Sequence, residues 1–452
     1  MEPSVVQRLS GWGRFPVQTC RVFRPEKRSS LPAILASGAE PSYIARGLGR
    51  SYGDAALNAA GAVITFERLN RMIGFDPATG VLECEAGVTL AEILDTFLPG
   101  GHTLPVTPGT KFVTLGGAIA NDVHGKNHHR VGTIGNFVLD FRLLTPGGDT
   151  ITCSRERHSD VFWATIGGAG LTGLLLSARI RLQPVETAYI RVDSRKVPNF
   201  EEAIALMTES DHLYDYSVAW IDCLARGRTL GRSVLMRGNP ARRTDLPARL
   251  RNPLARRLPP ERSLALDFPS GLLNRFSVGA FNAAFYRMHR NRTGQIVPME
   301  SYFYPLDSIR NWNRMYGRRG FVQYQLLFPL ETSAKGLLEV LESVSRSGRG
   351  SFLGVLKRFG EANGGLFSFP FPGYTLALDL PVADGLVAFL KSLDTLVLRH
   401  GGRLYLGKDA VTSPESFAAM YPRLEEFRAI KARLDPENKL SSSLSRRLAI
   451  TP

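Results

Sequence analysis

The chain has few cysteines and no long apolar run. Its 452 residues include four cysteines, which lie far apart and form no CxxC pair. A structural disulfide or a metal site is therefore not expected, and a reducing compartment suits this usage best. No stretch reaches the roughly 18–20 apolar residues of a membrane span, and residues 1–16 lack the pattern of a secretory signal. These absences favour a cytoplasmic location without a transmembrane segment.

The composition is that of a folded protein. Hydrophobic residues make up 44% and charged residues 21%, so disorder over most of the chain is not expected. There is no internal repeat and no low-complexity tail. At roughly 100–200 residues per domain, the length predicts two or three domains.

Positive charge is in excess and is concentrated. Lys and Arg number 56 against 41 Asp and Glu, which gives a net charge of +15. Residues 237–262 hold eight arginines, five prolines and only two acidic residues. Such a segment cannot bury much apolar surface, so we predict a mobile basic surface loop. The excess suits an acidic partner such as nucleic acid or an anionic membrane.

The first part of the chain is rich in glycine and in short β-type runs. Residues 72–75 and 81–86 read as a hairpin across a Pro- and Gly-containing turn. A helix is predicted to begin after Thr89, because Glu92 completes a capping box. These signals predict a β-rich first region.

The last part of the chain has a different rhythm. Strand-like runs at 322–328 and 374–380 alternate with helical patterns, and one helix is predicted to be capped by Asp384. Strands and helices within one segment suggest a sheet covered by helices. We therefore predict an α+β protein with a second region separate from the first.

The pattern Gly168-x-Gly170-x-x-Gly173 formally matches a dinucleotide fingerprint. That fingerprint requires a strand before the glycines and a helix after them. Here residues 160–166 look helical and residues 174–182 look extended, which is the reverse order. We interpret these glycines as a tight turn beside a ligand and not as a Rossmann site.

Two other Gly-rich stretches are more informative. Residues 45–54 contain three glycines, two arginines and a serine after a short strand, and residues 108–125 form a second stretch of small residues. Glycines let backbone N–H groups approach an anion such as a diphosphate. Small side chains also allow the backbone to approach a flat ligand.

With these stretches, the first 180 residues resemble the FAD-binding domain of the vanillyl-alcohol-oxidase type flavoproteins. The resemblance implies an FAD-binding domain at 1–187, completed by 403–452. It also implies an α+β substrate domain at 188–402, with an antiparallel sheet covered by helices and the mobile basic loop at about 237–262. Many members attach FAD through a histidine before the loop serine. Arg50 precedes Ser51 here, so non-covalent FAD is implied.

The resemblance also implies which residues contact the cofactor. They come from the two Gly-rich stretches and from two positions further along the chain: Arg46, Gly47, Leu48, Gly49, Arg50, Ser51, Tyr52, Gly53, Gly109, Thr114, Leu115, Gly116, Gly117, Asn121, Asp122, Val123, His124, Leu175 and Tyr405.

A narrower group within this family matches in order along nearly the whole chain. The matching segments are 45–54, 124–129, 162–165, 217–220, 312–314, 320–325 and 402–409. This group oxidises the ribose 2′-hydroxyl of a polyprenylphosphoryl-β-D-ribose to a ketone, with hydride passing to the flavin. The resemblance implies a partner NADH- or NADPH-dependent reductase, which completes epimerisation to the arabinose donor for cell-wall polysaccharide.

Several residues could contact the sugar. Gln323 and Gln325 lie two apart on a strand and share one face, so they could bind a polyol or make ordinary cross-strand bonds. Lys357 could bind the substrate phosphate or extend its amine from a strand edge. The resemblance favours substrate contact for all three, and also for Trp220 and Ala377. A cysteine is common in the family at the position of Ala377, which puts covalent inhibition there in doubt but not turnover.

The resemblance identifies Lys408 as the active-site lysine. Without it, Lys408 beside Asp409 would read as a surface ion pair. A lysine could remove the hydroxyl proton if its pKa is lowered, or stabilise an oxyanion as a cation. Both roles stay open at this point. His124, His128 and His129 are not read as metal ligands, since Lys126 would repel a cation.

Two other functions remain as alternatives. One is an alditol or aldonolactone oxidase acting on a soluble sugar, whose relatives usually carry the covalent histidine. The other is a non-catalytic basic protein that binds nucleic acid or membrane. No nucleic-acid motif is present, so we expect no nucleic acid partner. We expect the basic loop to seat the protein on an anionic membrane surface, on the cytoplasmic side, although the family resemblance allows a periplasmic one.

Overall fold

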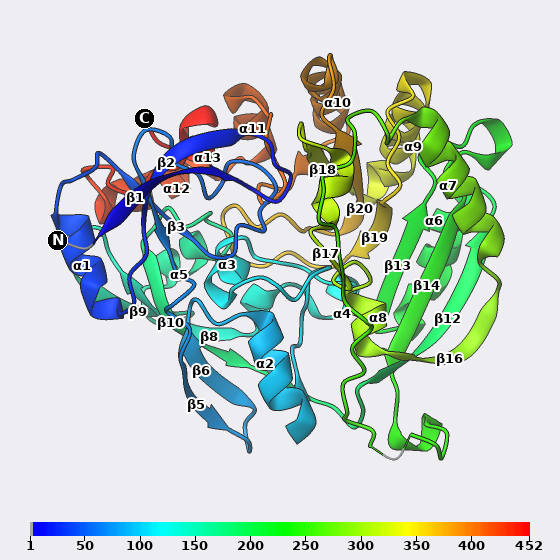
Figure 1. The fold of residues 1–452 in the computed structure, drawn as a ribbon, viewed down its shortest axis with the longest axis horizontal. Helices are drawn as coiled ribbons and strands as arrows, with labels where there is room; N and C mark the ends of the chain where they lie inside the picture. The colour runs from blue at the N-terminus through cyan, green and yellow to red at the C-terminus, as the bar shows by residue number, and fades with distance from the viewer. Residues whose placement is uncertain (1–2, 251) are drawn as a thin grey trace.

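The computed structural model describes residues 3–250 and 252–452. Two small sheets and one large sheet form its framework, which makes the protein a two-domain α+β flavoprotein-type fold (Figure 1). In the described part of the chain, no helix combines the length and the apolar character that crossing a bilayer requires.

The first small sheet has four strands. Their order is β1 (Ser4–Ser10), β2 (Val17–Phe23), β4 (Ala62–Thr65) and β3 (Tyr43–Arg46). Strand β4 is parallel to both of its neighbours. The Gly-rich loop that follows β3 therefore leaves the carboxyl edge of a buried strand.

The second small sheet has five antiparallel strands. Their order is β5 (Met72–Asp76), β6 (Val81–Glu85), β10 (Leu174–Arg181), β8 (Val138–Leu144) and β9 (Thr150–Ser154). The predicted hairpin is confirmed as β5 and β6. The order of helix and strand around the Gly168 turn is also as predicted, with α5 (Ser159–Thr165) before it and β10 after it.

The remaining helices of this part are short. They are α1 (Leu31–Ala36), α2 (Leu90–Phe97), α3 (Leu115–Ala120) and α4 (His128–Val131). The capping box predicted for α2 is confirmed: the Thr89 hydroxyl accepts a hydrogen bond from the Glu92 N–H at 3.1 Å, and the Glu92 carboxylate accepts from the Thr89 N–H at 2.7 Å.

The large sheet has eight antiparallel strands. Their order is β16 (Arg292–Pro298), β12 (Tyr189–Val197), β14 (Ser233–Pro240), β13 (Tyr216–Ile221), β19 (Gly354–Phe359), β20 (Gly373–Pro381), β18 (Phe321–Pro329) and β21 (Arg403–Leu404). One face packs on α6 (Phe200–Ser210), α9 (Leu330–Ser347) and α10 (Leu386–Arg399). The helices α7 (Arg275–Met288) and α8 (Met299–Phe303) belong to the same half of the molecule (Figure 1).

The cap predicted for α10 is wrong. Gly385 precedes the helix in the left-handed conformation, with φ of 75°, and no side chain caps the helix. Asp384 is exposed instead and lies near Arg319 at 3.3 Å. A glycine that accepts a positive φ makes the side-chain cap unnecessary.

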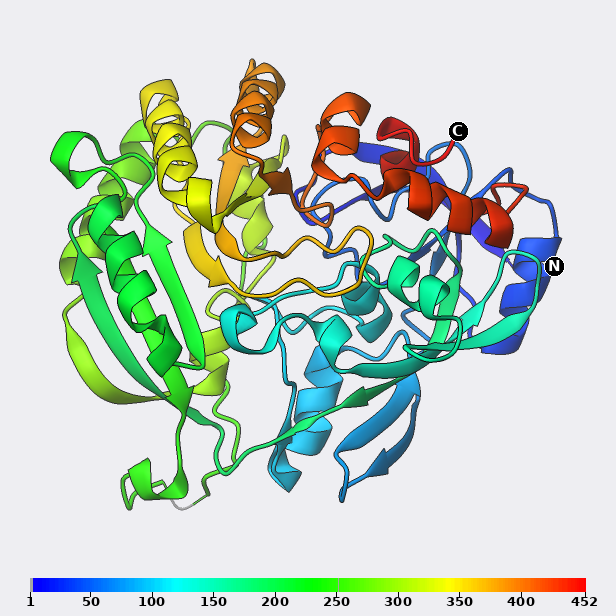
Figure 2. The same ribbon diagram turned by 180° about the vertical axis from the view of Figure 1, so that it is seen from behind.

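The C-terminal segment returns to the N-terminal sheet. Its helices are α11 (Pro414–Met420), α12 (Leu424–Leu434) and α13 (Ser443–Arg447). Figure 2 shows these red helices beside the blue N-terminal strands. The Tyr43 N–H donates to the Lys439 carbonyl at 2.6 Å, and Arg447 pairs with Asp54 at 2.7 Å. Residues far apart in sequence thus meet at the loop after β3.

The predicted basic loop is shorter and better anchored than its composition suggests. Strand β14 continues to Pro240, and Arg237 is buried with its guanidinium hydrogen-bonded to Ser210. The Arg256 side chain is 8% exposed and pairs with Glu300 and Asp95. The expectation of a mobile loop over all of 237–262 is corrected in this respect, because strand β14 occupies its start and the Glu300 carboxylate and Ser210 hydroxyl hold two of its arginines.

Candidate active site

A cavity of about 670 Å³ lies between the Gly-rich loops and the open face of the large sheet. This volume is in the range of ligand and cofactor sites. Its walls come from the loop after β3, from residues 107–126, and from alternate residues of the large sheet. The cavity therefore has a wall of small residues and a wall of strand side chains.

The loop after β3 bends around a half-buried arginine, Arg46. The Arg46 guanidinium donates to the Ser10 carbonyl at 2.7 Å and to the Ala56 carbonyl at 3.2 Å. Gly49 adopts a φ of 64°, and a Cβ there would collide with that guanidinium. Arg46 thus shapes the loop from inside, while Arg50 lies 3.9 Å from the ring centroid of Trp12 at the cavity wall.

The second wall segment also contains several residues with small side chains. Thr114 accepts the Gly117 N–H at 3.2 Å and begins α3. Gly116 packs on Ala86, where an added Cβ would approach to 2.8 Å, whereas a Cβ at Gly109 would meet nothing within 4 Å. We call residues 46–52 and 109–117 the small-residue cradle.

The structure brings most of the predicted cofactor residues to the cavity wall but not all. Gly53, Leu115 and Asp122 lie outside it. Leu115 is fully buried in the core. The Asp122 carboxylate accepts from the Gly135 N–H at 3.1 Å and from Asn363 at 2.7 Å. A Cβ at Gly53 would collide with the Asp409 carbonyl. These three residues support the wall from behind.

His124 lines the cavity and carries one buried ring nitrogen that has no hydrogen-bond partner in the described structure. Its Nε2 accepts from the Gln325 amide at 3.0 Å, which places the proton on Nδ1, and Nδ1 has no hydrogen-bond partner in the described structure. Burial, and then the charge of Lys357, holds the pKa of His124 well below its usual value, so the ring is neutral. Beside it, the Tyr405 hydroxyl donates to the Asn121 carbonyl at 2.8 Å.

These features fit FAD. Several glycines of the small-residue cradle have no room for a side chain. Because no side chain covers the backbone there, a flat ring and a diphosphate can approach it closely. His124 and Tyr405 add two rings to this wall, against which a flat ring can pack. The predicted cofactor residues that line the wall, including Leu175 and Tyr405, would hold the group.

The strand wall is built by the register of the large sheet. In β18 and β20, Gln323 faces Asp379 and Gln325 faces Ala377. The Gln323 amide donates to Asp379 at 2.5 Å, and the Gln325 amide donates to Thr375 at 3.2 Å. Both glutamines therefore make cross-strand bonds and also line the cavity. The cross-strand interpretation is confirmed, and contact with a sugar stays a prediction.

Lys408 lies at the meeting point of the two walls. Its ammonium nitrogen is 3.7 Å from the ring centroid of Tyr52. Burial lowers the pKa of Lys408 to about 7; Asp379 raises it and Lys357 lowers it. Burial also raises the pKa of Asp379 to about 7. A lysine with this pKa is partly neutral near neutral pH and can accept a proton.

Two more lysines line the same end of the cavity. Burial lowers the pKa of Lys357 to about 8 and, together with the charge of Lys357, that of Lys126 to about 7. Lys126 donates to the Tyr302 carbonyl and lies 4.4 Å from the centroid of that ring. The sequence did not indicate Lys126 as a ligand-binding residue, because the neighbouring histidines were the stronger signal in its segment. Three amines at one end of a cavity favour an anionic ligand.

Most of the remaining strand wall is apolar. It includes Val192, Val218, Met236 and Val297, from the strands farthest from Lys408 in the sheet order, with Ser194 and Gln295 as its polar members. The Trp220 indole donates to the Phe352 carbonyl at 2.9 Å, and its ring packs 4.5 Å from that of Phe285. Trp220 thus belongs to the apolar part, and the cavity has one charged end and one apolar end.

Two family profiles and several known proteins match the sequence of this chain. A family profile described as an FAD binding domain matches residues 21–154, and one described as D-arabinono-1,4-lactone oxidase matches residues 382–448. Decaprenylphosphoryl-beta-D-ribose oxidase of Mycolicibacterium smegmatis is 39% identical over 99% of this chain and 98% of its own length. An uncharacterised protein of Streptomyces coelicolor is 36% identical over 80% of this chain and all of its own length.

More distant similarity is limited to part of the chain. L-galactono-1,4-lactone dehydrogenase 1 of rice is 29% identical over 41% of this chain and 31% of its own length. Fold, cavity and matches together define an FAD-dependent oxidoreductase that acts on an alcohol. Within that class, the chain belongs to the decaprenylphosphoryl-beta-D-ribose oxidase family.

Proposed function

We propose that this protein oxidises the ribose 2′-hydroxyl of a polyprenylphosphoryl-β-D-ribose to the 2′-ketone. The observation that carries the proposal is the polarity of the cavity. A phosphorylated sugar suits the end with three lysines, and a prenyl chain suits the apolar end. The small-residue cradle adjoins the charged end, so the sugar and the cofactor would meet at Lys408.

FAD, when bound, supplies the hydride acceptor for the carbinol C–H. We propose that it is held without a covalent bond, since Arg50 replaces the family's linking histidine. The neutral His124 would pack beside the ring. Lys408 would accept the hydroxyl proton through Nζ, because burial lowers its pKa to about 7. Gln323 and Gln325 would orient the remaining hydroxyls.

The flavin itself reports the proposed reaction. Under anaerobic conditions, mixing the FAD-loaded protein with polyprenylphosphoryl ribose is expected to bleach the visible absorbance of the oxidised flavin. Xylitol and aldonolactones should not bleach it. The match of residues 382–448 to a lactone oxidase makes lactones the sharpest competitors. Bleaching by a lactone but not by the lipid-linked pentose would contradict the proposal.

Lys357 would bind the substrate phosphate. Replacing it with methionine is expected to raise KM for the phosphorylated substrate about tenfold to a hundredfold, since hydrogen bonds to charged groups contribute about 1.5–3 kcal/mol. The kcat should change less, and an analogue without phosphate should show no KM effect. Lys335→Met, on the exposed side of α9, is the matched control. An unchanged KM for the phosphorylated substrate would remove Lys357 from this role.

The product requires a second enzyme. A 2′-keto sugar must be reduced on its other face for epimerisation to arabinose, which calls for an NADH- or NADPH-dependent reductase as partner. A prenyl chain also implies a bilayer as the source of substrate. We propose that the protein associates with an anionic membrane surface, on the cytoplasmic side.

A further inference from the structure

The outer face of α7 is apolar although it is exposed. Phe276 is 71% and Met288 is 73% exposed, and Ala280 and Ala284 between them are exposed as well. These four residues recur every four positions and form one stripe along the helix. A surface helix of a soluble protein normally turns polar side chains to water. The stripe on α7 has none, so it has the pattern of a contact surface.

The surroundings of this stripe are basic and also apolar. Residues 268–299 contain no Asp or Glu but four exposed arginines, which are Arg275, Arg287, Arg290 and Arg292. Leu266 and Leu272, which precede the helix, are exposed too. An apolar stripe flanked by arginines is the chemistry of a helix that lies in the interface of an anionic bilayer.

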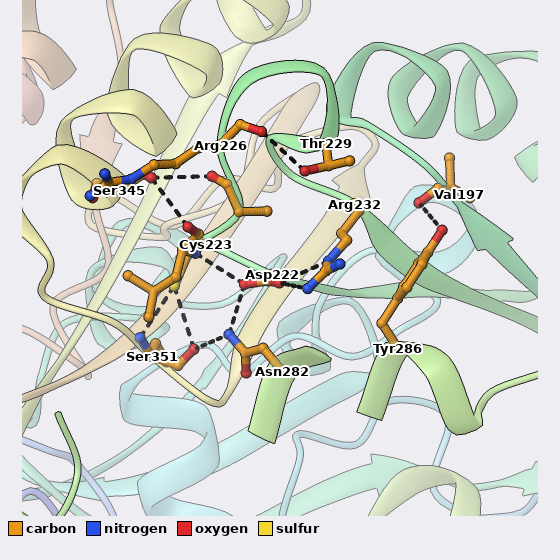
Figure 3. Close-up of polar contacts among 12 residues, drawn as sticks. Val197, Asp222, Cys223, Arg226, Thr229, Arg232, Asn282, Tyr286, Ser345 and Ser351 are labelled. Atoms are coloured by element: carbon orange, nitrogen blue, oxygen red, sulfur yellow. Dashed lines mark hydrogen bonds and ion pairs between the residues drawn. The ribbon is translucent and has the colours of Figure 1, made fainter. Parts of the chain in front are cut away.

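Polar contacts hold α7 to the sheet from inside. The Asn282 amide donates to Asp222 at 2.8 Å, and Arg232 holds the other carboxylate oxygen of Asp222 at 2.8 Å (Figure 3). One turn later, the Tyr286 hydroxyl donates to the Val197 carbonyl at 3.3 Å. Asn282 is fully buried. These bonds fix the rotation of the helix, and they leave the apolar stripe pointing outward.

The same helix borders the apolar end of the cavity. Phe281 and Phe285 line the cavity, and Phe281 is also exposed. Its ring lies 5.7 Å from that of Phe352, and the Phe285 ring lies 4.2 Å from His289. One helix thus carries both the outward stripe and the inner aromatic wall. Figure 1 shows it on the opposite side of the molecule from the N-terminus.

We propose that the stripe Phe276–Ala280–Ala284–Met288 and its flanking arginines dock on an anionic bilayer. The prenyl chain would then pass from the bilayer into the cavity beside Phe281. This inference rests on the proposed lipid-linked substrate and names the element that meets the membrane. It adds α7 to the basic segment expected to meet the membrane, in which Arg237 and Arg256 are held by protein partners.

The FAD-loaded protein can be tested by co-sedimentation with vesicles. Phosphatidylcholine vesicles with phosphatidylglycerol are expected to bind it, and vesicles of phosphatidylcholine alone should bind it less. The double variant Phe276→Glu/Met288→Glu should lose at least tenfold in partitioning to the anionic vesicles. Its matched control is Leu213→Glu/Val387→Glu, which places the same charges on two exposed apolar sites elsewhere. That control should bind as the natural protein does.

A second readout separates this proposal from the proposed function. Phe276 and Met288 do not line the cavity, so the variant should reduce its flavin normally with detergent-dispersed polyprenylphosphoryl ribose. If the natural protein fails that reaction, the proposed function fails while the vesicle comparison still stands. Equal vesicle binding by variant and natural protein would overturn the docking proposal. So would a natural dimer in solution that the variant converts to a monomer without any vesicle binding.

Discussion

Lys408→Ala is expected to lower kcat by about a hundredfold to ten-thousandfold, the usual contribution of a positioned general base. The amine lies 3.7 Å from the Tyr52 ring centroid at the junction of the two cavity walls. Alanine removes the proton acceptor and leaves the walls in place, so bound FAD and the unfolding midpoint should be retained. Lys391→Ala, on the exposed face of α10, is the control for loss of one positive charge.

The pH profile distinguishes the two roles of this lysine. As a base it must be neutral, so kcat should rise with pH through about 7, the value to which burial lowers the pKa of Lys408. Lys408→Arg keeps a cation at all these pH values. It should therefore remain as inactive as the alanine variant. Substantial activity in Lys408→Arg, with no dependence on pH between 6 and 8, would assign the lysine as a cation.

Arg447→Ala is expected to lower the free energy of unfolding by about 3–5 kcal/mol, since it leaves buried carboxylates without their counter-charge. The guanidinium donates to Asp54 at 2.7 and 2.9 Å, and it pairs with Asp409 at 3.0 Å. Both carboxylates are buried. Urea unfolding followed by tryptophan fluorescence measures the difference. Arg433→Ala, which removes an exposed pair with Asp160, should cost about 1 kcal/mol or less.

The same substitution should change the response to acid. Arg447 and the N–H groups of Val411 and Thr412 hold the pKa of Asp409 below its usual value, against the effect of burial. In the natural protein, the lowered pKa of Asp409 contributes to the free energy of unfolding at pH values above the pKa of an unfolded Asp. That contribution is lost as the pH falls. In Arg447→Ala, protonation of the Asp409 carboxyl removes a buried charge that has lost its partner, which stabilises the folded state. The difference in unfolding free energy between the natural protein and Arg447→Ala should therefore narrow toward pH 4 (about the unfolded pKa of Asp). A gap that is constant with pH would contradict the electrostatic cause.

Local features of the fold could be predicted from the sequence because their signals lie within a few residues. The capping box of Thr89 and Glu92 and the hairpin at 72–86 are examples. The face shared by Gln323 and Gln325 follows from the two-residue period of a strand. A local signal can also give a wrong prediction. Asp384 was expected to cap α10, but the helix is preceded by Gly385 in the left-handed conformation.

The parts that could not be predicted depend on partners distant in sequence. The register of β18 with β20 brings Asp379 to Gln323, and no local signal reports that register. Lys126 reaches the charged end of the cavity through contact with Tyr302, 176 residues away. A contiguous motif also hides which way each side chain points. Leu115 lies inside a cofactor stretch and yet faces the core.

The pairing of Tyr43 with Leu440 sets an order of events during synthesis. The ribosome makes the loop after β3 early, but the chain that supports it, with Arg447 against Asp54, emerges after the whole large sheet. Asp54 is made 393 residues before Arg447, so the loop after β3 can bury this carboxylate against its counter-charge only when the chain is nearly complete.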